Sequence, residues 1–173
     1  MKKLFFTISA LTLLFFAQSV NAQDKSKDIV DIAVSVEDFS TLVTALKAAD
    51  LVGALQGDGP FTVFAPVNSG FAKIDSSALN SLLEPANKEK LAGILTYHVV
   101  SGKLVAGDVV KALEAGNGKA ELTTLNGATL TAVKKNDGIY LKDANGNMSK
   151  IAKTDVMASN GVIHIIEDVV MPK

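Results

Sequence analysis

The sequence predicts an α+β domain, with helices in the first half of the chain and β-hairpins in the last third. Apolar residues recur at i, i+3, i+4 and i+7 over residues 29–36 and again over residues 39–46, which is one face of a helix. Asn-Gly and Asn-Asp-Gly turns at residues 126–127 and 136–138 separate short β-prone runs. No internal repeat or linker divides the chain, so helices followed by a β-meander predict one domain.

The start of the chain predicts a secretory signal peptide. Lys2 and Lys3 give a positive beginning, residues 4–17 form an apolar run, and Val20-Asn21-Ala22 places small side chains where a signal peptidase reads. The apolar run is shorter than the roughly 20 residues that span a bilayer as a helix, so no membrane-spanning segment is expected. Cleavage is expected near Ala22. The expected division is a signal peptide at residues 1–22, a polar leader at 23–27, and a secreted or periplasmic domain at 28–173.

One β-prone run interrupts the helical half of the chain. The turn cluster GDGP at residues 57–60 precedes residues 61–65, which are rich in β-branched and aromatic side chains and are followed by Pro66. A short strand is expected here. Asn68 or Ser69 is expected to cap the helical turn that follows.

Three further helical segments are expected before the hairpins begin. Residues 76–84 have weak helical character, and Asn87 then caps a better helix whose apolar face carries Leu91, Ile94, Leu95 and His98. Residues 104–105 suggest a short extended piece, and residues 108–115 a helix that ends at Gly116. Strands are expected over residues 120–124, 128–133, 138–142, 148–151, 153–158 and 162–166.

The composition excludes several classes of function. The chain has 173 residues and no Cys, which excludes disulfides, thiolate zinc sites and thiol catalysis. All 17 basic residues are Lys. Without Arg, the chain has no planar guanidinium group to form bidentate hydrogen bonds with phosphate or guanine, so no nucleic-acid partner is expected. The formal net charge is −1, close to balance.

No sequence motif predicts a catalytic, cofactor or metal site. The two histidines, His98 and His164, both lie in apolar settings, where a buried, hydrogen-bonded ring is the commoner role than a ligand or an acid–base couple. Asp143-Ala144-Asn145-Gly146-Asn147 resembles the opening of a calcium loop, but Met148 and Thr154 stand at its Gly and Glu positions. A serine elbow and a glycine-rich phosphate loop are also missing.

Three stretches resemble the signature blocks of the fasciclin-like domain. They are residues 62–71 (TVFAPVNSGF), 95–104 (LTYHVVSGKL) and 160–172 (NGVIHIIEDVVMP), in the family's order and spacing. The resemblance covers about residues 26–173. The overall pattern of the chain is similar to that of small secreted bacterial proteins with a single such domain. It implies a wedge-shaped β-sandwich of about seven strands in two sheets, with several helices packed along one side.

The resemblance also implies a set of residues for adhesion or for the fold. The Tyr-His block is implicated in adhesion in some animal members, so Tyr97, His98 and Val99 either contact a partner or only hold the fold. Asn160-Gly161 is expected to form a turn in which Gly adopts a positive φ. This chain has Ser69-Gly70 where the family usually has an acidic residue and Ala, which puts in doubt any contact through a carboxylate there. The candidate residues are Tyr97, His98, Val99, Thr62, Asn68, Asn160, Gly161 and His164.

Three functions remain open from the sequence. The first is a non-enzymatic adhesion module, monomeric and without cofactor or metal, that recognises a surface or matrix protein or a polysaccharide. The second is a carrier that holds a small apolar or lipid ligand between helices and sheet. The third is a hydrolase with an unrecognised site.

Overall fold

The computed structural model describes residues 27–173 of the chain. The predicted signal peptide at residues 1–22 and all but the last residue of the predicted leader lie outside this part. Within residues 27–173, no helix is both long and apolar enough to cross a bilayer.

Helices occupy much of the chain between residues 28 and 115, and two of them have side-chain hydrogen bonds that cap their N-termini. Asp28 and Asp31 form a reciprocal capping box at the start of α1, and the Asp75 carboxylate accepts hydrogen bonds from two backbone N–H groups at the start of α5. The helices in the described residues are α1 (Ile29–Ser35), α2 (Ser40–Ala48), α3 (Val52–Leu55), α4 (Asn68–Phe71), α5 (Ser76–Leu83), α6 (Lys88–Tyr97) and α7 (Ala106–Ala115), with short 3-10 turns at Glu37–Phe39 and Pro85–Asn87.

The strands form one curved, nearly closed sheet. In residues 27–173 they are β1 (Phe61–Pro66), β2 (Val99–Ser101), β3 (Lys119–Thr123), β4 (Thr129–Lys135), β5 (Gly138–Lys142), β6 (Met148–Ala158) and β7 (Gly161–Ile166). Their order is β2-β1-β7-β6-β5-β4-β3, with β1 and β7 parallel and the other neighbours antiparallel. A single bridge between Val100 and Thr124 brings β2 next to the end of β3. The sheet therefore folds back on itself into two halves.

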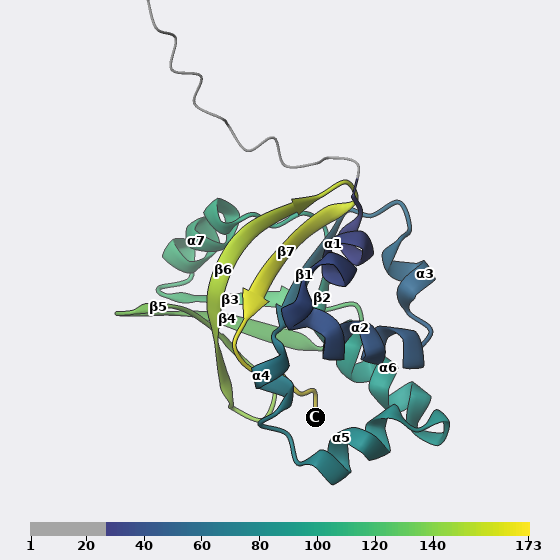
Figure 1. Ribbon diagram of the computed structural model, residues 1–173. Helices are drawn as coiled ribbons and strands as arrows, with labels where there is room; N and C mark the ends of the chain where they lie inside the picture. The colour runs from purple at the N-terminus through teal and green to yellow at the C-terminus, as the bar shows by residue number, and fades with distance from the viewer. Residues whose placement is uncertain (1–26) are drawn as a thin grey trace, which may run out of the picture.

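The β1 strand separates two apolar clusters because alternate side chains point to opposite faces. Val63 and Ala65 pack into a cluster with α1, α2, α3 and α6, whereas Phe64 packs between the two halves of the sheet. Val109 and Leu113 of α7 complete the second cluster. Figure 1 shows α1, α2 and α3 at one side of the sheet and α7 at the opposite side. The α+β class, with a seven-strand sheet and packed helices in the described chain, is confirmed.

The structure differs from the sequence-based expectations at several places. Residues 104–105 are not a strand; β2 lies instead at residues 99–101, immediately after α6. Residues 148–158 form the single strand β6 and not the two strands expected, because its register shifts after Ile151 and Lys153 interrupt the regular pattern within one strand. The helix α3 was not expected because it has only four residues. Asn87 does not cap α6 through its side chain, since its Nδ2 donates back to the carbonyl oxygen of Ser81 at 2.8 Å.

Candidate functional site

Tyr97 and His98 lie at the C-terminal end of α6, and both are buried, with exposed fractions of 0% and 2%. The Tyr97 hydroxyl donates to the carbonyl oxygen of Thr129 on β4 at 2.9 Å. The Nδ1 of His98 lies 2.8 Å from the carbonyl oxygen of Ile94, and its Nε2 accepts from the backbone N–H of Val170 at 3.2 Å. This pattern assigns the proton to Nδ1 and joins the end of α6 to the C-terminal segment.

Both of these side chains are uncharged at neutral pH, and burial favours their neutral forms further. Loss of solvation lowers the pKa of His98 from 6.5 to about 4, against the opposing effect of its hydrogen bond to Ile94. Loss of solvation also raises the pKa of the Tyr97 hydroxyl. The two groups therefore hold backbone segments together in their neutral forms.

Thr62 and His164 hold the loop that follows β2. The Thr62 hydroxyl donates to the carbonyl oxygen of Gly102 at 2.7 Å and accepts from the backbone N–H of Leu104 at 2.8 Å. His164 Nε2 lies 2.7 Å from the carbonyl oxygen of Leu104, and its Nδ1 accepts from the N–H of Asp155 at 3.3 Å. Burial lowers the pKa of His164, whose ring is stacked on Phe64, so the ring is neutral and both its nitrogens are engaged.

The sequence suggests that Asn68 or Ser69 caps the helical turn that follows β1, but the Asn68 side chain does not cap this turn. The N-cap of α4 is Val67, and the Asn68 side chain instead reaches across to the start of α2. Its Oδ1 accepts from the N–H of Thr41 at 3.0 Å, and its Nδ2 donates to the carbonyl oxygen of Glu37 at 3.0 Å and to the hydroxyl of Ser40 at 2.9 Å. Asn68 therefore satisfies an unpaired amide of another helix, 27 residues away in sequence.

Asn160 and Gly161 join β7 to the start of the domain. The Asn160 side chain accepts from the N–H of Ile29 at 3.0 Å and donates to the carbonyl oxygens of Leu55 and Gly57 at 2.7 and 3.1 Å. Gly161 does not have the positive φ expected of it. It is required by close approach, because a Cβ there would lie 2.1 Å from the carbonyl oxygen of Phe61.

The eight candidate residues are thus placed in the interior or half-buried at its edge. Val99 is 3% exposed and packs among the helices. Two histidine rings with every nitrogen bonded to backbone cannot ligate a metal or transfer a proton without breaking those bonds. Within residues 27–173, no three His, Asp or Glu side chains gather as metal ligands would. In the described structure, the polar members of this set make internal hydrogen bonds.

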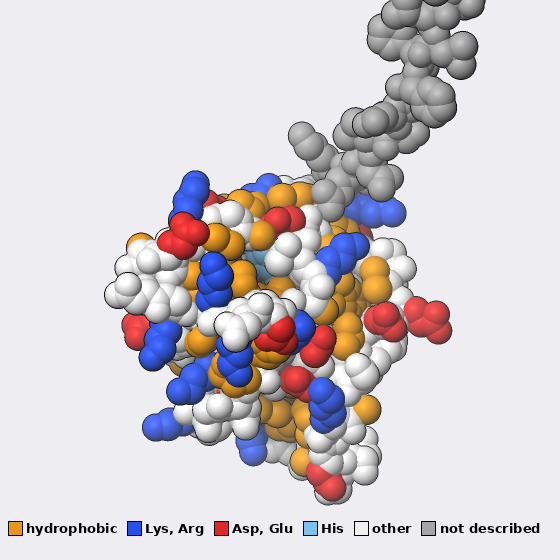
Figure 2. Space-filling model, turned by 90° about the vertical axis from the view of Figure 1, so that its left-hand side faces the viewer, with side chains coloured by type: hydrophobic (Ala, Val, Ile, Leu, Met, Phe, Trp, Pro, Cys, Tyr) orange, Lys and Arg blue, Asp and Glu red, His pale blue; other side chains and the backbone are white. Residues whose placement is uncertain are grey.

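A different set of residues forms an exposed polar surface that the sequence did not reveal. The outer face of β3–β6 carries Lys119, Lys135, Tyr140, Lys142 and Lys150, hereafter the lysine face. Strand register aligns these side chains, because Val133 pairs with both Lys119 and Tyr140, and Tyr140 pairs with Lys150. Figure 2 shows Lys side chains gathered at the lower left of this side of the molecule.

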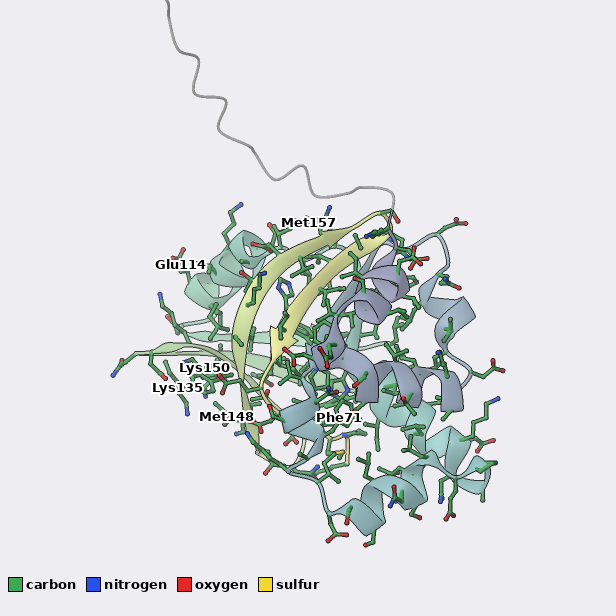
Figure 3. The ribbon with its side chains drawn as sticks, in the orientation of Figure 1. Phe71, Glu114, Lys135, Met148, Lys150 and Met157 are labelled. Carbon is green, nitrogen blue, oxygen red and sulfur yellow. The ribbon has the colours of Figure 1, made fainter. Side chains whose placement is uncertain are left out.

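Tyr140 lies at the centre of a small charged network on the lysine face. The ammonium groups of Lys135 and Lys150 lie 4.7 and 6.0 Å from the centre of its ring, and its hydroxyl donates to Asp137 at 2.7 Å. Lys150 also pairs with Asp137 at 3.2 Å. These bonds, from Tyr140 first and then Lys150, lower the pKa of Asp137. Figure 3 shows Lys135 and Lys150 close together below β5.

An open hollow of about 500 Å³ adjoins this network. Its lining combines hydroxyl, amide and charged groups, and these are Lys119, Glu121, Thr129, Thr131, Lys142, Asp143 and Asn145. Buried Asp143 holds the turn at its edge, because its carboxylate accepts from the N–H groups of Asn145 and Asn147 at 2.9 and 2.8 Å. The hollow therefore offers several hydrogen-bonding groups beside a hydrogen-bonded turn.

The apolar space between helices and sheet is much smaller. The cavity lined by Ile29, Leu46 and Val63 has a volume of about 20 Å³. Small-molecule sites usually have about 300–1,000 Å³, and this cavity is close to the size of one water molecule. It cannot hold a lipid chain in this conformation.

The chain belongs to the fasciclin-domain family. The family's model, described as the fasciclin domain, matches residues 37–172, which confirms the resemblance of the three signature stretches.

Relatives share this domain in bacteria and animals. The chain is 46% identical to "Protein sll1483" of Synechocystis sp., over 87% of this chain and 77% of that protein. It is 34% identical to the transforming growth factor-beta-induced protein ig-h3 of Sus scrofa, over 83% of this chain but 19% of that longer protein. A solved FAS1 domain pair from the insect cell adhesion molecule Fasciclin I has the same fold, with a TM-score of 0.73 and 20% identity over 84% of this chain and 51% of that one.

Proposed function

We propose that this protein is a non-enzymatic binding module that attaches to a surface or matrix protein or polysaccharide. The observation that carries this proposal is the contrast between polar side chains that make internal hydrogen bonds and polar side chains that face solvent. The polar candidate residues of the signature stretches make internal hydrogen bonds, whereas the lysine face and its adjoining hollow present polar groups to solvent. Membership of the fasciclin-domain family supports the same reading, because the insect protein that shares its fold is described as a cell adhesion molecule.

The carrier alternative has less support. A carrier needs an enclosed apolar space, and the cavity between helices and sheet is only about 20 Å³. A rigid domain that binds through its exterior needs no such space.

The proposal places the protein outside the cytoplasm. Its basis is the predicted signal peptide, and the expected product begins at Gln23 after cleavage at Ala22. Mass spectrometry of protein recovered from the periplasm and the medium tests both points. A chain that keeps residues 1–22 would contradict the predicted cleavage.

Attachment to isolated cell envelope tests the function. Protein expressed from its full sequence, purified in the form that cells produce, is mixed with washed envelope and sedimented, and the bound fraction is measured against concentration. Saturable binding is expected. No binding to envelope or matrix material would overturn the proposal.

Tyr97→Phe separates the two roles offered for the Tyr-His block. The variant keeps the buried ring but loses the hydroxyl bond to Thr129, so stability should fall by about 1 kcal/mol while binding stays unchanged. Loss of envelope binding in a variant that remains folded would instead make Tyr97 part of the contact surface.

A further inference from the structure

We propose that the lysine face binds an acidic polysaccharide, a sugar polymer that carries carboxylate or sulfate groups. This inference rests on the proposed function, and it specifies both the surface and the chemical class of partner. Three observations on the described residues lead to it: the separation of charge, the alignment of the lysines and the groups that line the hollow.

Positive charge is concentrated in the strands that form this face. Residues 119–158, from the start of β3 to the end of β6, contain six Lys and four acidic residues, a net charge of +2. The other described residues, 27–118 and 159–173, contain eight Lys and thirteen acidic residues, a net charge of −5. Because salt screens charges over about 8–10 Å, a polyanion at the lysine face interacts more strongly with the lysines there than with carboxylates farther away.

The lysines are placed to follow a linear polymer. Lys119 and Lys150 lie on β3 and β6, three strand spacings or about 14 Å apart, with Lys142 on β5 between these strands. Within residues 27–173, Lys119 and Lys142 form no ion pair, so their charges are available to a partner. Glu121 also lies on this face, and Asp137 at its edge is already paired with Lys150. Two further carboxylates lie nearby, because Asp143 lines the hollow and Glu167 interacts electrostatically with Lys150. Lys119, Lys135 and Lys142 are the lysines of this face that form no ion pair within residues 27–173.

The hollow supplies the neutral contacts that a sugar needs. Thr129, Thr131 and Asn145 line it beside Lys119 and Lys142. Their hydroxyl and amide groups can both donate and accept, which matches sugar hydroxyls, while the lysines match the acidic groups. The match to a charged polymer rich in hydroxyls is what favours a polysaccharide over another anion.

A lipid surface fits this face less well. Membrane-surface binding needs apolar side chains that enter the headgroup region as well as positive charge. The large apolar side chains that are exposed in the described residues are Val34 and Leu125, and neither is on the lysine face. Met148 and Tyr140 are on it but are partly covered by their neighbours.

Binding to immobilised polymers tests the inference with a charge-matched control. The probes are polygalacturonate, dextran sulfate and neutral dextran, with vesicles of phosphatidylglycerol and phosphatidylcholine as a lipid probe. The face variant is Lys119→Gln/Lys135→Gln/Lys142→Gln. The control variant is Lys47→Gln/Lys90→Gln/Lys111→Gln, which removes the same charge from exposed helix positions.

The wild-type protein should bind an acidic polymer and not neutral dextran, and 1 M NaCl should abolish binding. The face variant should bind about tenfold or more weakly, whereas the control variant should change less than about twofold. Equal losses in both variants, equal binding to neutral dextran, or face-dependent binding to vesicles alone would overturn the inference. Envelope attachment without binding to either acidic polymer would overturn this inference but leave the proposed function standing. A protein that binds neither the envelope nor an acidic polymer would overturn both the inference and the proposed function.

Discussion

Acidification should destabilise the protein through His98. The ring is buried and neutral in the folded state, with its pKa lowered to about 4, whereas in the unfolded chain it returns to its ordinary value of 6.5. Between pH 4 and pH 6.5, His98 is protonated in the unfolded chain but stays neutral in the folded chain. His98 therefore contributes its full stability above pH 6.5, and that contribution is lost as the pH falls from 6.5 toward 4.

The expected magnitude follows from this difference in pKa. At about 1.4 kcal/mol per pH unit, the interval from 6.5 to 4 corresponds to roughly 3 kcal/mol of unfolding free energy. The structural cause is specific. A second proton on the ring at Nε2 would meet the backbone N–H of Val170, which now donates to that nitrogen, so protonation breaks the link to the C-terminal segment.

Urea unfolding at pH values from 7 to 4 measures the effect, with His98→Gln as the comparison. For an m-value of about 2 kcal/mol per molar urea, the wild-type midpoint should fall by about 1.5 M more than that of the variant. The comparison removes the contributions of surface carboxylates and of His164, which titrate in both proteins. The chain has only two histidines, so the imidazole NMR signals can be assigned and followed directly.

Two results would refute the reasoning. The first is an ordinary His98 titration near pH 6.5 in the folded protein. The second is a pH dependence of stability that is the same in the wild type and in His98→Gln. Either would mean that solvent reaches the ring or that the bond to Val170 is unimportant.

Two further pairs of substitutions test close packing and side-chain capping by thermal and urea unfolding. Gly161→Ala should cost more than about 3 kcal/mol or prevent folding because its Cβ would meet the carbonyl oxygen of Phe61 at 2.1 Å, whereas Gly93→Ala, with open space inside α6, should stabilise by about 1 kcal/mol. Equal effects would contradict the steric explanation. Asn68→Ala should cost about 2 kcal/mol through its lost hydrogen bonds, against less than about 0.5 kcal/mol for Ser69→Ala at the exposed neighbouring position. A smaller loss of stability for Asn68→Ala than for Ser69→Ala would contradict this explanation and favour the local helix cap that the sequence suggested.

The candidate site illustrates how far local sequence can lead. The three signature stretches located the residues that matter for the fold, and the apolar setting of His98 and His164 predicted buried, bonded rings. The partners of those rings could not be predicted. His98 bonds to Val170, which is 72 residues away, and His164 to Leu104, which is 60 residues away. Such pairs exist only after distant segments have packed together.

The sequence by itself determined the helical faces, the hairpin turns and the absence of thiol chemistry, because periodicity, turn residues and composition act through neighbours along the chain. The tertiary structure alone decided that β1 lies parallel to β7, that Asn68 serves α2, and that four scattered lysines share one face. Strand order and register depend on the packing of the whole chain around two apolar clusters in its described part. A lysine that looks solitary in the sequence therefore becomes part of a charged surface only when the sheet has formed.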